Sequence, residues 1–312
     1  MEKKSFKLNK TTAYLMIVLV LFVWGASPLV NAKMNEKYSV AFRSAVMGVI
    51  TVVALFVICA KKLKNINAEY FKHAIPTGVF LAVAEIVQKI GLIYSTPAKY
   101  AFLENLSCVV VPIILLFAIR KKPSVITVCS SFLCLVGSFI LSGLNFGDKS
   151  VGFAKGEILC ALAGVLYGVN IAYTGICIKK FDTLLYLLVQ HCTVAVTSLI
   201  SAILFSIICI DGAPIETIRF SFDLGGIVVL VALALVATLL CWFLRTLAMK
   251  VVSPTAVSII MPFSSVITGV ASVLLGMDVL GLEFLIGGGI VLIAAILSGV
   301  GDLREEKILL KK

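Results

Sequence analysis

The chain has 312 residues, of which 61% are hydrophobic and 14% charged, and its mean hydropathy is +1.12. A soluble domain carries about 25% charged residues, so this composition excludes an ordinary soluble protein and indicates an integral membrane protein. The net charge of +11 would also suit a nucleic-acid-binding protein. The positions of the basic residues, given below, argue against nucleic acid as a partner.

Ten apolar runs follow one another along the chain, joined by short linkers and with no soluble domain between them. Each is close to the roughly 20 residues that a membrane-spanning helix needs. The helices of the first half are predicted at 11–32, 38–60, 73–94, 97–119 and 123–143. Those of the second half are predicted at 153–177, 182–210, 222–248, 254–275 and 281–301. We therefore expect an all-α integral membrane protein with ten transmembrane helices.

The first run is predicted to be a retained helix, not a cleaved signal peptide. It stays mostly apolar from Ala13 to Ala32, whereas the apolar core of a signal peptide is about 7–15 residues long.

Lysine and arginine gather in the tails and in the linkers that lie on the same side of the membrane as the N-terminus. Nineteen of the 27 basic residues lie there: 3, 4, 7, 10, 61, 62, 64, 72, 120, 121, 122, 179, 180, 245, 250, 304, 307, 311 and 312. Positive residues favour the cytoplasmic side. We therefore expect a multi-pass protein of the plasma membrane with both ends in the cytoplasm.

Short sequence words recur in the same order in the two halves of the chain. The words at 24–25, 96–97 and 140–143 correspond to those at 167–168, 253–254 and 296–299. They indicate two five-helix repeats, residues 1–150 and 151–312. Because five is odd, the second repeat enters the membrane from the opposite face. Inverted repeats of this kind are typical of secondary transporters, whose site lies near the midplane between the halves.

Several motifs resemble the EamA-like family of the drug/metabolite transporter superfamily. They are Trp24-Gly25, Arg43, the segments 94–98 and 101–103, Val111-Pro112 and the segment 120–124. The resemblance implies ten helices, with helices one to four and six to nine around a central cavity and helices five and ten more peripheral. It implies transport of small metabolites, often amino acids and often outward. At 276–278 the chain reads Gly-Met-Asp where the family commonly has a Gly-Glu pair.

Four charged residues are predicted to converge in the outer half of the membrane. Glu85 and Lys89 share one face of the third helix because they are four residues apart. The tight turn at 95–97 places Glu104 of the fourth helix beside them, and Arg43 lies early in the second helix. Charges inside a membrane cost several kcal/mol and mark functional sites by default.

Two interpretations of this cluster stay open. It is either a structural ion-pair network, in which Lys89 and Arg43 extend towards the membrane surface, or a polar vestibule for substrate. In the vestibule, Arg43 or Lys89 would hold a carboxylate, and Glu85 or Glu104 would hold an amine or a coupling proton. A carboxyl group in a partly dry site binds protons more readily, so Glu85 and Glu104 are the proton-coupling candidates.

The second half has no matching acid in mid-membrane, and Arg245 near the inner end of the eighth helix is its charged residue. Gln190 and His191 lie in the seventh helix, and Asn170 in the sixth. His191 is either a hydrogen-bonded packing residue or a proton relay, and Trp24 and Tyr167 are either an inverted pair at the site or packing residues. The expected substrate-binding residues are Trp24, Arg43, Glu85, Gln88, Lys89, Glu104, Asn105, Tyr167, Asn170, Gln190 and His191.

Two prolines are expected to interrupt helices in corresponding members of the halves, Pro112 in the fourth helix and Pro262 in the ninth. Interrupted helices at matching positions point to a transport site. Arg245 in the eighth helix corresponds to Gln88 in the third, 157 positions earlier.

Enzyme motifs are absent or incomplete in the sequence. Gly299-Val300-Gly301-Asp302 has the GxGD form of membrane aspartyl proteases, but the second aspartate that such a protease needs inside a helix is missing. There is no HExxH, GxSxG or P-loop motif, and the nine cysteines form no CxxC pair. We therefore expect no catalytic residues, no metal and no cofactor.

The predicted function is a secondary transporter that exports small metabolites such as amino acids by alternating access. Its expected partners are a small-molecule metabolite, protons and the lipid bilayer, and its oligomeric state stays open. The alternative is a non-transporting scaffold or sensor subunit whose intramembrane charges only pair helices.

Overall fold

The computed structural model describes residues 8–35, 37–94, 97–120, 122–142, 155–210, 213–276 and 281–309. The predicted turn at Ser95-Thr96 and the last residue of the word at 140–143 lie outside these residues, as does Met277-Asp278. So does the expected boundary between the halves at residues 150 and 151, which stays a prediction.

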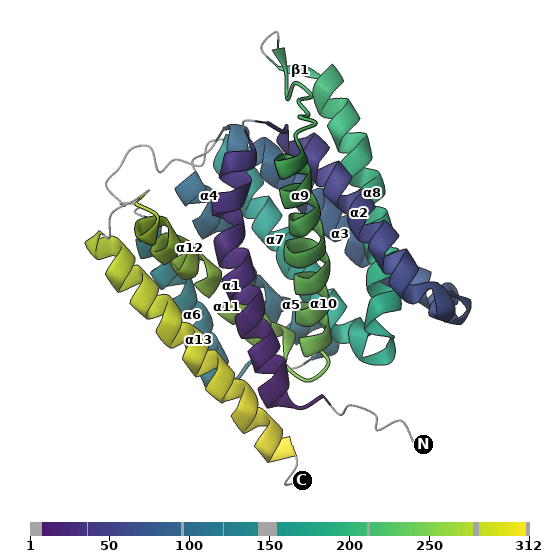
Figure 1. Ribbon diagram of the computed structural model, residues 1–312. Coiled ribbons are helices and arrows are strands. Elements are labelled where there is room, and N and C mark those ends of the chain that lie inside the picture. Colours follow the sequence, from purple (N-terminus) through teal and green to yellow (C-terminus); the bar gives the residue numbers. More distant parts are fainter. Residues whose placement is uncertain are drawn as a thin grey trace.

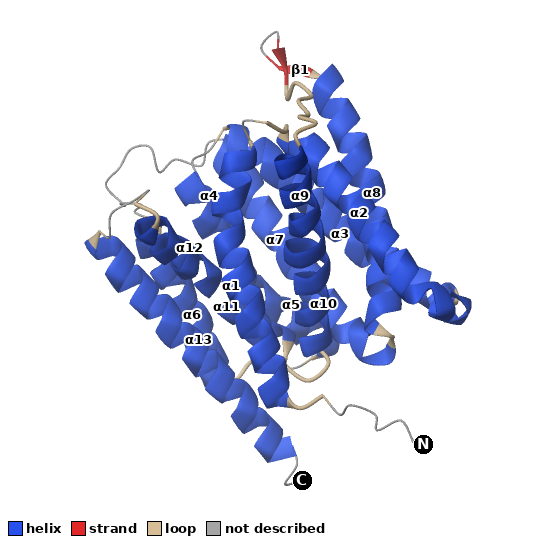
Figure 2. Ribbon diagram, in the orientation of Figure 1, coloured by secondary structure: helices blue, strands red, loops and turns tan. Residues whose placement is uncertain are grey.

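Helices account for nearly all of the described chain (Figure 2). The first half contains α1 (Lys10–Met34), α2 (Val40–Cys59), the 3₁₀ helix η1 (Ala60–Asn65), α3 (Ala68–Ile93), α4 (Pro97–Glu104), α5 (Ser107–Ile119) and α6 (Val125–Leu141). The second half contains α7 (Lys155–Cys177), the 3₁₀ helix η2 (Ile178–Lys180), α8 (Thr183–Ile207), α9 (Leu224–Ala232), the π-helix η3 (Leu233–Leu240), α10 (Cys241–Ala248), α11 (Pro254–Ile260), α12 (Phe263–Leu274) and α13 (Leu282–Leu309).

Many helix starts coincide with residues whose side chains accept a hydrogen bond from the first free backbone N–H groups, which is the usual way to cap a helix. These residues are Asn9, Asn67, Ser124, Asp182, Asp223 and Ser253. Polar caps between apolar runs explain why the predicted spans and the observed helices begin within a few residues of each other.

The predicted all-α membrane fold of two inverted five-helix repeats is confirmed. Nine described helical stretches are long and apolar enough to cross a membrane, and α6, with 17 residues, is a shorter apolar helix. In Figure 1, α1 begins at the lower end of the bundle, whereas α7 begins at the upper end. The first residues of α1 and the last turns of α13 lie together at the lower end.

Three predicted helices are interrupted or irregular. The fourth span consists of α4 and α5, the ninth of α11 and α12, and the eighth passes from α9 through the π-helix η3 into α10. A short antiparallel pair of strands, β1 (Cys209–Ile210) and β2 (Ala213–Pro214), follows α8, with Cys209 opposite Pro214 and Ile210 opposite Ala213. The rest of the segment up to Asp223 connects to α9 without regular structure.

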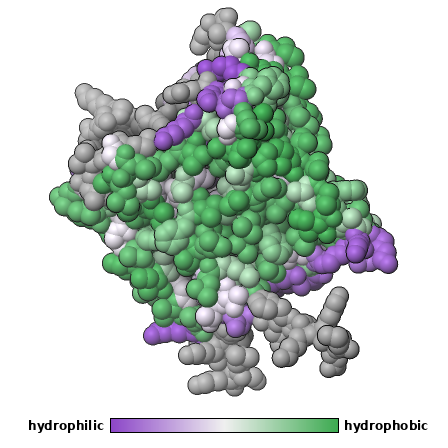
Figure 3. All heavy atoms as spheres, in the orientation of Figure 1, coloured by the Kyte–Doolittle hydropathy of each residue, from purple (hydrophilic) through white to green (hydrophobic). Residues whose placement is uncertain are grey.

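The outer surface of the helices suits lipid. Large apolar side chains are exposed on it, for example Phe117 and Val125, each at 79%. Figure 3 shows hydrophobic side chains over the middle of the visible face and hydrophilic ones towards its two ends. This banded surface is what a bilayer-spanning protein requires.

Helices α6 and α13, the fifth and tenth spans, pack against each other along their length on one side of the bundle (Figure 1). Glycines allow this close approach: a Cβ atom at Gly287 would lie 2.4 Å from the backbone nitrogen of Leu141. The remaining spans surround the interior, which is where the candidate site lies.

Candidate functional site

The two helix interruptions lie at equivalent positions of the inverted halves. Helix α4 ends and α5 begins around Asn105 and Leu106, and α11 ends and α12 begins around Met261 and Pro262. Each position in the second half lies 156 residues after its counterpart in the first. Both interruptions contain tight i to i+3 hydrogen bonds, from Cys108 N–H to Asn105 O and from Ser264 N–H to Met261 O, both 3.0 Å.

Pro262 is thus at an interruption, as predicted, but the prediction for Pro112 was wrong. Pro112 lies inside α5. A proline removes the hydrogen bond to the carbonyl four residues earlier, which here belongs to Cys108. The Ser131 hydroxyl of α6 donates to this carbonyl at 2.9 Å, so the helix continues without an unsatisfied group.

Glycines bring α1 and α7 onto these interruptions in a reciprocal arrangement. A Cβ atom at Gly25 of α1 would lie 2.6 Å from the Ile267 side chain and 3.0 Å from the Ser264 carbonyl of α12. A Cβ atom at Gly168 of α7 would lie 2.7 Å from the Val110 side chain of α5. Ile267 follows Val110 by 157 positions. Each half therefore places its first helix against the interrupted helix of the other half.

A cluster of aromatic and basic side chains fills the space beside these contacts. The rings of Trp24 in α1 and Trp242 in α10 meet edge to face at 5.8 Å. The Arg245 guanidinium lies 4.0 Å from the Trp242 ring and 5.5 Å from the Trp24 ring. The His191 ring of α8 contacts Trp242 at 5.6 Å. Arg245 and His191 are 4% and 3% exposed, so both polar groups are buried within the spanning region.

The π-helix η3 anchors this cluster. The Trp24 indole Nε1–H donates to the Ala237 carbonyl at 2.8 Å, and the Thr51 hydroxyl of α2 donates to the Ala234 carbonyl at 3.2 Å. Widened turns of this type often occur at functional sites. Here their carbonyls accept side-chain hydrogen bonds from α1 and α2.

The symmetry-related position, which joins one helix of each half, carries a neutral pair. The Tyr167 hydroxyl of α7 donates to Gln88 Oε1 of α3 at 2.6 Å. Tyr167 corresponds to Trp24, and Gln88 corresponds to Arg245. The repeat therefore places an aromatic residue beside a long polar side chain twice, once as tyrosine with glutamine and once as tryptophan with arginine.

The predicted charged residues form an electrostatic network that reaches Tyr167. Lys89 interacts with Glu85, Arg43 and Glu216, and Tyr167 with Glu85 and Glu104. The buried Lys89 Nζ has no hydrogen-bond partner among the residues that the structure describes.

Arg43 contacts different groups from those expected. Its Nη1 donates to the Asn31 carbonyl at 3.1 Å and to Asn35 Oδ1 at 2.9 Å, both at the upper end of α1. The carboxylate with which it interacts electrostatically is Glu216. The two oxygens of Glu216 accept hydrogen bonds from the Val40 and Ala41 N–H groups at the start of α2. Arg43 therefore helps to hold the upper ends of α1 and α2.

Of the remaining predicted residues, Asn105 and Asn170 form hydrogen bonds between helices, whereas the amide of Gln190 forms none among the described residues. Asn105 Nδ2 donates to the Ser138 hydroxyl at 3.0 Å, and Asn170 Nδ2 donates to the Thr77 carbonyl at 2.8 Å. Gln190 is fully buried, and in the described part of the chain neither atom of its amide has a partner. Gln190 and Lys89 thus offer polar atoms that are not used in the free protein.

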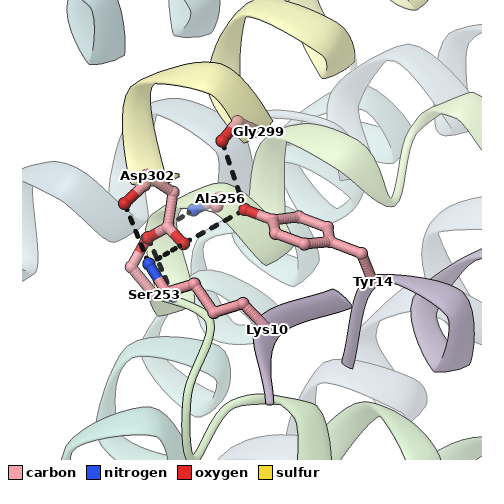
Figure 4. Close-up of polar contacts among 6 residues, drawn as sticks. All are labelled: Lys10, Tyr14, Ser253, Ala256, Gly299 and Asp302. Carbon is pink, nitrogen blue, oxygen red and sulfur yellow. Dashed lines mark hydrogen bonds and ion pairs between the residues drawn. The ribbon is translucent and has the colours of Figure 1, made fainter. Parts of the chain in front are cut away.

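Polar contacts around Asp302 close the lower end of the bundle (Figure 4). Its carboxylate accepts hydrogen bonds from Lys10 Nζ at 2.8 Å, from the Tyr14 hydroxyl at 3.1 Å and from the Ser253 N–H at 3.2 Å. Ser253 in turn caps α11 through the Ala256 N–H. One carboxylate thus holds together α1, α11 and α13.

A second lower contact fixes the start of α8. Asp182 accepts hydrogen bonds from the Leu184 and Leu185 N–H groups and from Lys62 Nζ, the last at 2.8 Å. Burial raises the pKa of Asp182, but the contacts with Lys62 and the two N–H groups outweigh burial, so its pKa lies below the ordinary value. At the upper end, hydrogen bonds from the Gly226 N–H and then from Lys37 and Ser221 lower the pKa of Asp223.

Sequence reasoning missed Trp242 and Glu216 as parts of these clusters and did not select Arg245. Trp242 could have been found because the chain has only two tryptophans. Arg245 could have been selected from its correspondence with Gln88. No signal in the sequence predicts the cap that Glu216 forms, because it depends on how the segment after β2 folds back over α2.

Comparisons with known proteins agree with this architecture. A family model described as the EamA-like transporter family matches residues 11–143 and 154–300. A search of curated proteins found no match. Twenty-eight chains of solved structures match. One of them, titled "Crystal structure of protein", has a TM-score of 0.75 and 15% identity, over 96% of this chain and 100% of its own length. At that identity the similarity shows the fold alone.

Proposed function

Since the chain belongs to the EamA-like transporter family, we propose that it exports small metabolites, amino acids among them, across the plasma membrane by alternating access. The observation that carries this proposal is the pair of interruptions at 105–106 and 261–262, at equivalent positions of inverted halves. Interrupted helices at such positions free backbone groups at the membrane midplane, where transported molecules bind.

The reciprocal contacts suggest how the halves move. Gly25 and Gly168 each hold the first helix of one half against the interrupted helix of the other, so a rotation of one half shifts both contacts together. The lower end opens when the Asp302 contacts separate. The upper end opens when the Glu216 cap and the Arg43 contacts separate. Alternating access requires that these two sets of contacts break in turn.

The predicted charged residues then line the path between the two ends. Lys89 and Glu85 supply charges of opposite sign beside Tyr167, and Glu85 or Glu104 carries the coupling proton. The basic residues of the lower end, such as Lys62 and Lys250, which contact the segment before α8, support a cytoplasmic location for that end.

Exchange in proteoliposomes tests this proposal. Vesicles loaded with an unlabelled amino-acid mixture and diluted into radiolabelled amino acids should accumulate label through the reconstituted protein and not through empty vesicles. Glu85→Gln should remove the pH dependence of this exchange. Glu283→Gln, at an exposed position in the first turn of α13, is the matched control and should behave like the parent. No exchange of any labelled metabolite would favour the scaffold or sensor alternative.

A further inference from the structure

Arg245 carries a buried charge, and no described carboxylate lies within ion-pair distance of it. The side chain belongs to α10 and is 4% exposed. In the part of the chain that the structure describes, its Nε and Nη2 atoms have no hydrogen-bond partner, and no ion pair reaches the guanidinium within 4.0 Å. A cation inside a membrane protein usually pairs with another group or marks a substrate pathway.

The geometry of the guanidinium shows which group is missing. Nε–H and Nη2–H point from the same edge of the plane, and this edge is a fork that binds the two oxygens of a carboxylate. Trp242 and Trp24 lie beside the same guanidinium, at 4.0 and 5.5 Å from Cζ. An aromatic face attracts a cation, but it offers no acceptor to N–H groups in the plane. The tryptophans therefore position the fork without occupying it.

Two polar rings, those of Tyr167 and His191, lie close enough to interact electrostatically with the guanidinium, and the other walls around the fork are apolar. Trp242 packs with Leu81 and Ala82 of α3 and with Val194 of α8. On the side of Trp24 lie Val20 and Leu244. A ligand whose charged end reaches Arg245 would place its remaining atoms against these side chains.

We infer that Arg245, framed by Trp24 and Trp242, is an anion subsite that holds the carboxylate of a transported molecule with an apolar or aromatic body. This inference rests on the proposed transport function and names its substrate class. It also assigns the carboxylate to a different cation from those that the sequence suggested, because Arg43 is held by Asn31 and Asn35.

Intrinsic fluorescence gives a direct measurement. Trp24 and Trp242 are the only tryptophans of the chain, and both contact Arg245, so their emission reports occupancy of the subsite. Phenylacetate is the anionic probe, phenylacetamide its neutral counterpart and phenethylamine its cationic one. Phenylacetate should change the emission of the purified protein saturably below about 10 mM. Phenylacetamide and phenethylamine should bind at least about tenfold more weakly, a difference of about 1.4 kcal/mol.

Substitutions separate binding from packing. Arg245→Gln should lose the phenylacetate response, and Arg245→Lys, which keeps the charge but not the fork, should weaken it at least about tenfold. Arg219→Gln, an exposed arginine beyond β2, is the control and should respond like the parent. If Arg245 served packing alone, Arg245→Gln would unfold at a lower temperature. If Arg245 is instead a ligand site, Arg245→Gln should unfold at the parent temperature or above it, because the substitution removes a buried unpaired charge.

Several results would overturn the inference: no saturable response to phenylacetate, an equal response to phenylacetamide, or full affinity in Arg245→Lys. The exchange assay described above, run on the same preparation, separates the two proposals. Exchange without an anion response overturns the subsite alone. Anion binding that depends on Arg245, without exchange of any metabolite, overturns the transport function and leaves the subsite standing.

Discussion

The contact between Gly164 of α7 and the end of α4 gives the sharpest test of the packing at the interruption. A Cβ atom at Gly164 would lie 2.3 Å from the Leu103 carbonyl oxygen and 3.2 Å from Glu104 Cα. Both are backbone atoms, so neither can move aside by a change of rotamer. Gly164→Ala must therefore push α7 and α4 apart by about 1 Å, because carbon and carbonyl oxygen approach to about 3.3 Å.

The magnitude follows from two opposing effects. Inserting a methyl group into a well-packed interior costs about 1–3 kcal/mol. Alanine favours the helix over glycine by about 1 kcal/mol, which offsets part of this cost. We expect the free energy of unfolding to fall by about 1–2 kcal/mol, because the obstacle is backbone and the cost of overpacking therefore lies at the upper end of its range. For a chain of this size, that corresponds to a fall of about 2–8 °C in the unfolding temperature.

Thermal unfolding in detergent, followed by tryptophan emission, measures this change. Gly289→Ala in α13 is the matched control, because nothing lies within 4 Å of its Cβ position, and it should unfold at the parent temperature or slightly above. Gly168→Ala should fall between the two, because its closest neighbour is the Val110 side chain. If Gly164→Ala unfolds at or above the temperature of Gly289→Ala, the close approach of α7 to the interruption is wrong.

Three further predictions concern the two ends of the bundle. Asp302→Asn should lower the unfolding temperature by a few degrees in the same assay, since loss of a charged hydrogen-bond partner costs about 1–3 kcal/mol; an unchanged temperature would contradict its role. Asp182, whose pKa is lowered, stabilises the fold above its unfolded-state pKa of about 3.9 and loses this effect as the pH falls further. Asp182→Asn, which keeps the cap, should therefore flatten the acid side of the stability profile measured between about pH 3 and 7. Finally, a membrane-impermeant maleimide added to whole cells should modify the exposed Cys209 at the upper end and fail to do so in Cys209→Ser; no reaction would place this end inside.

The number and order of the helices could be predicted because they depend on local properties: twenty apolar residues in a row have one stable form in a membrane. The direction of insertion, inferred from the basic linkers, stays a prediction. The correspondence of Trp24-Gly25 with Tyr167-Gly168 could also be read from the sequence, and the contacts of Gly25 and Gly168 agree with it.

The positions of the interruptions could not be predicted with the same success, because they depend on tertiary contacts. Pro112 is the stronger local signal, yet Ser131 satisfies the carbonyl that it leaves free. The first interruption falls instead at Asn105, where no proline is present and where α7 packs on the Leu103 carbonyl. In the same way, the partners of Arg43 depend on where Glu216 folds back, which no short pattern encodes.

The difference between the two repeat-related pairs bears on how a substrate would lie. Identical inverted halves would offer the same chemistry towards both ends of the bundle, and an asymmetric molecule would then bind equally well in two opposite orientations. Here Tyr167 with Gln88 is a neutral hydrogen-bonded pair close to Glu85 and Glu104. Trp24 with Arg245 is a cationic pair. An anionic group would gain free energy at Arg245 and a cationic group near the glutamates, so the divergence of the two halves favours one orientation of a zwitterion.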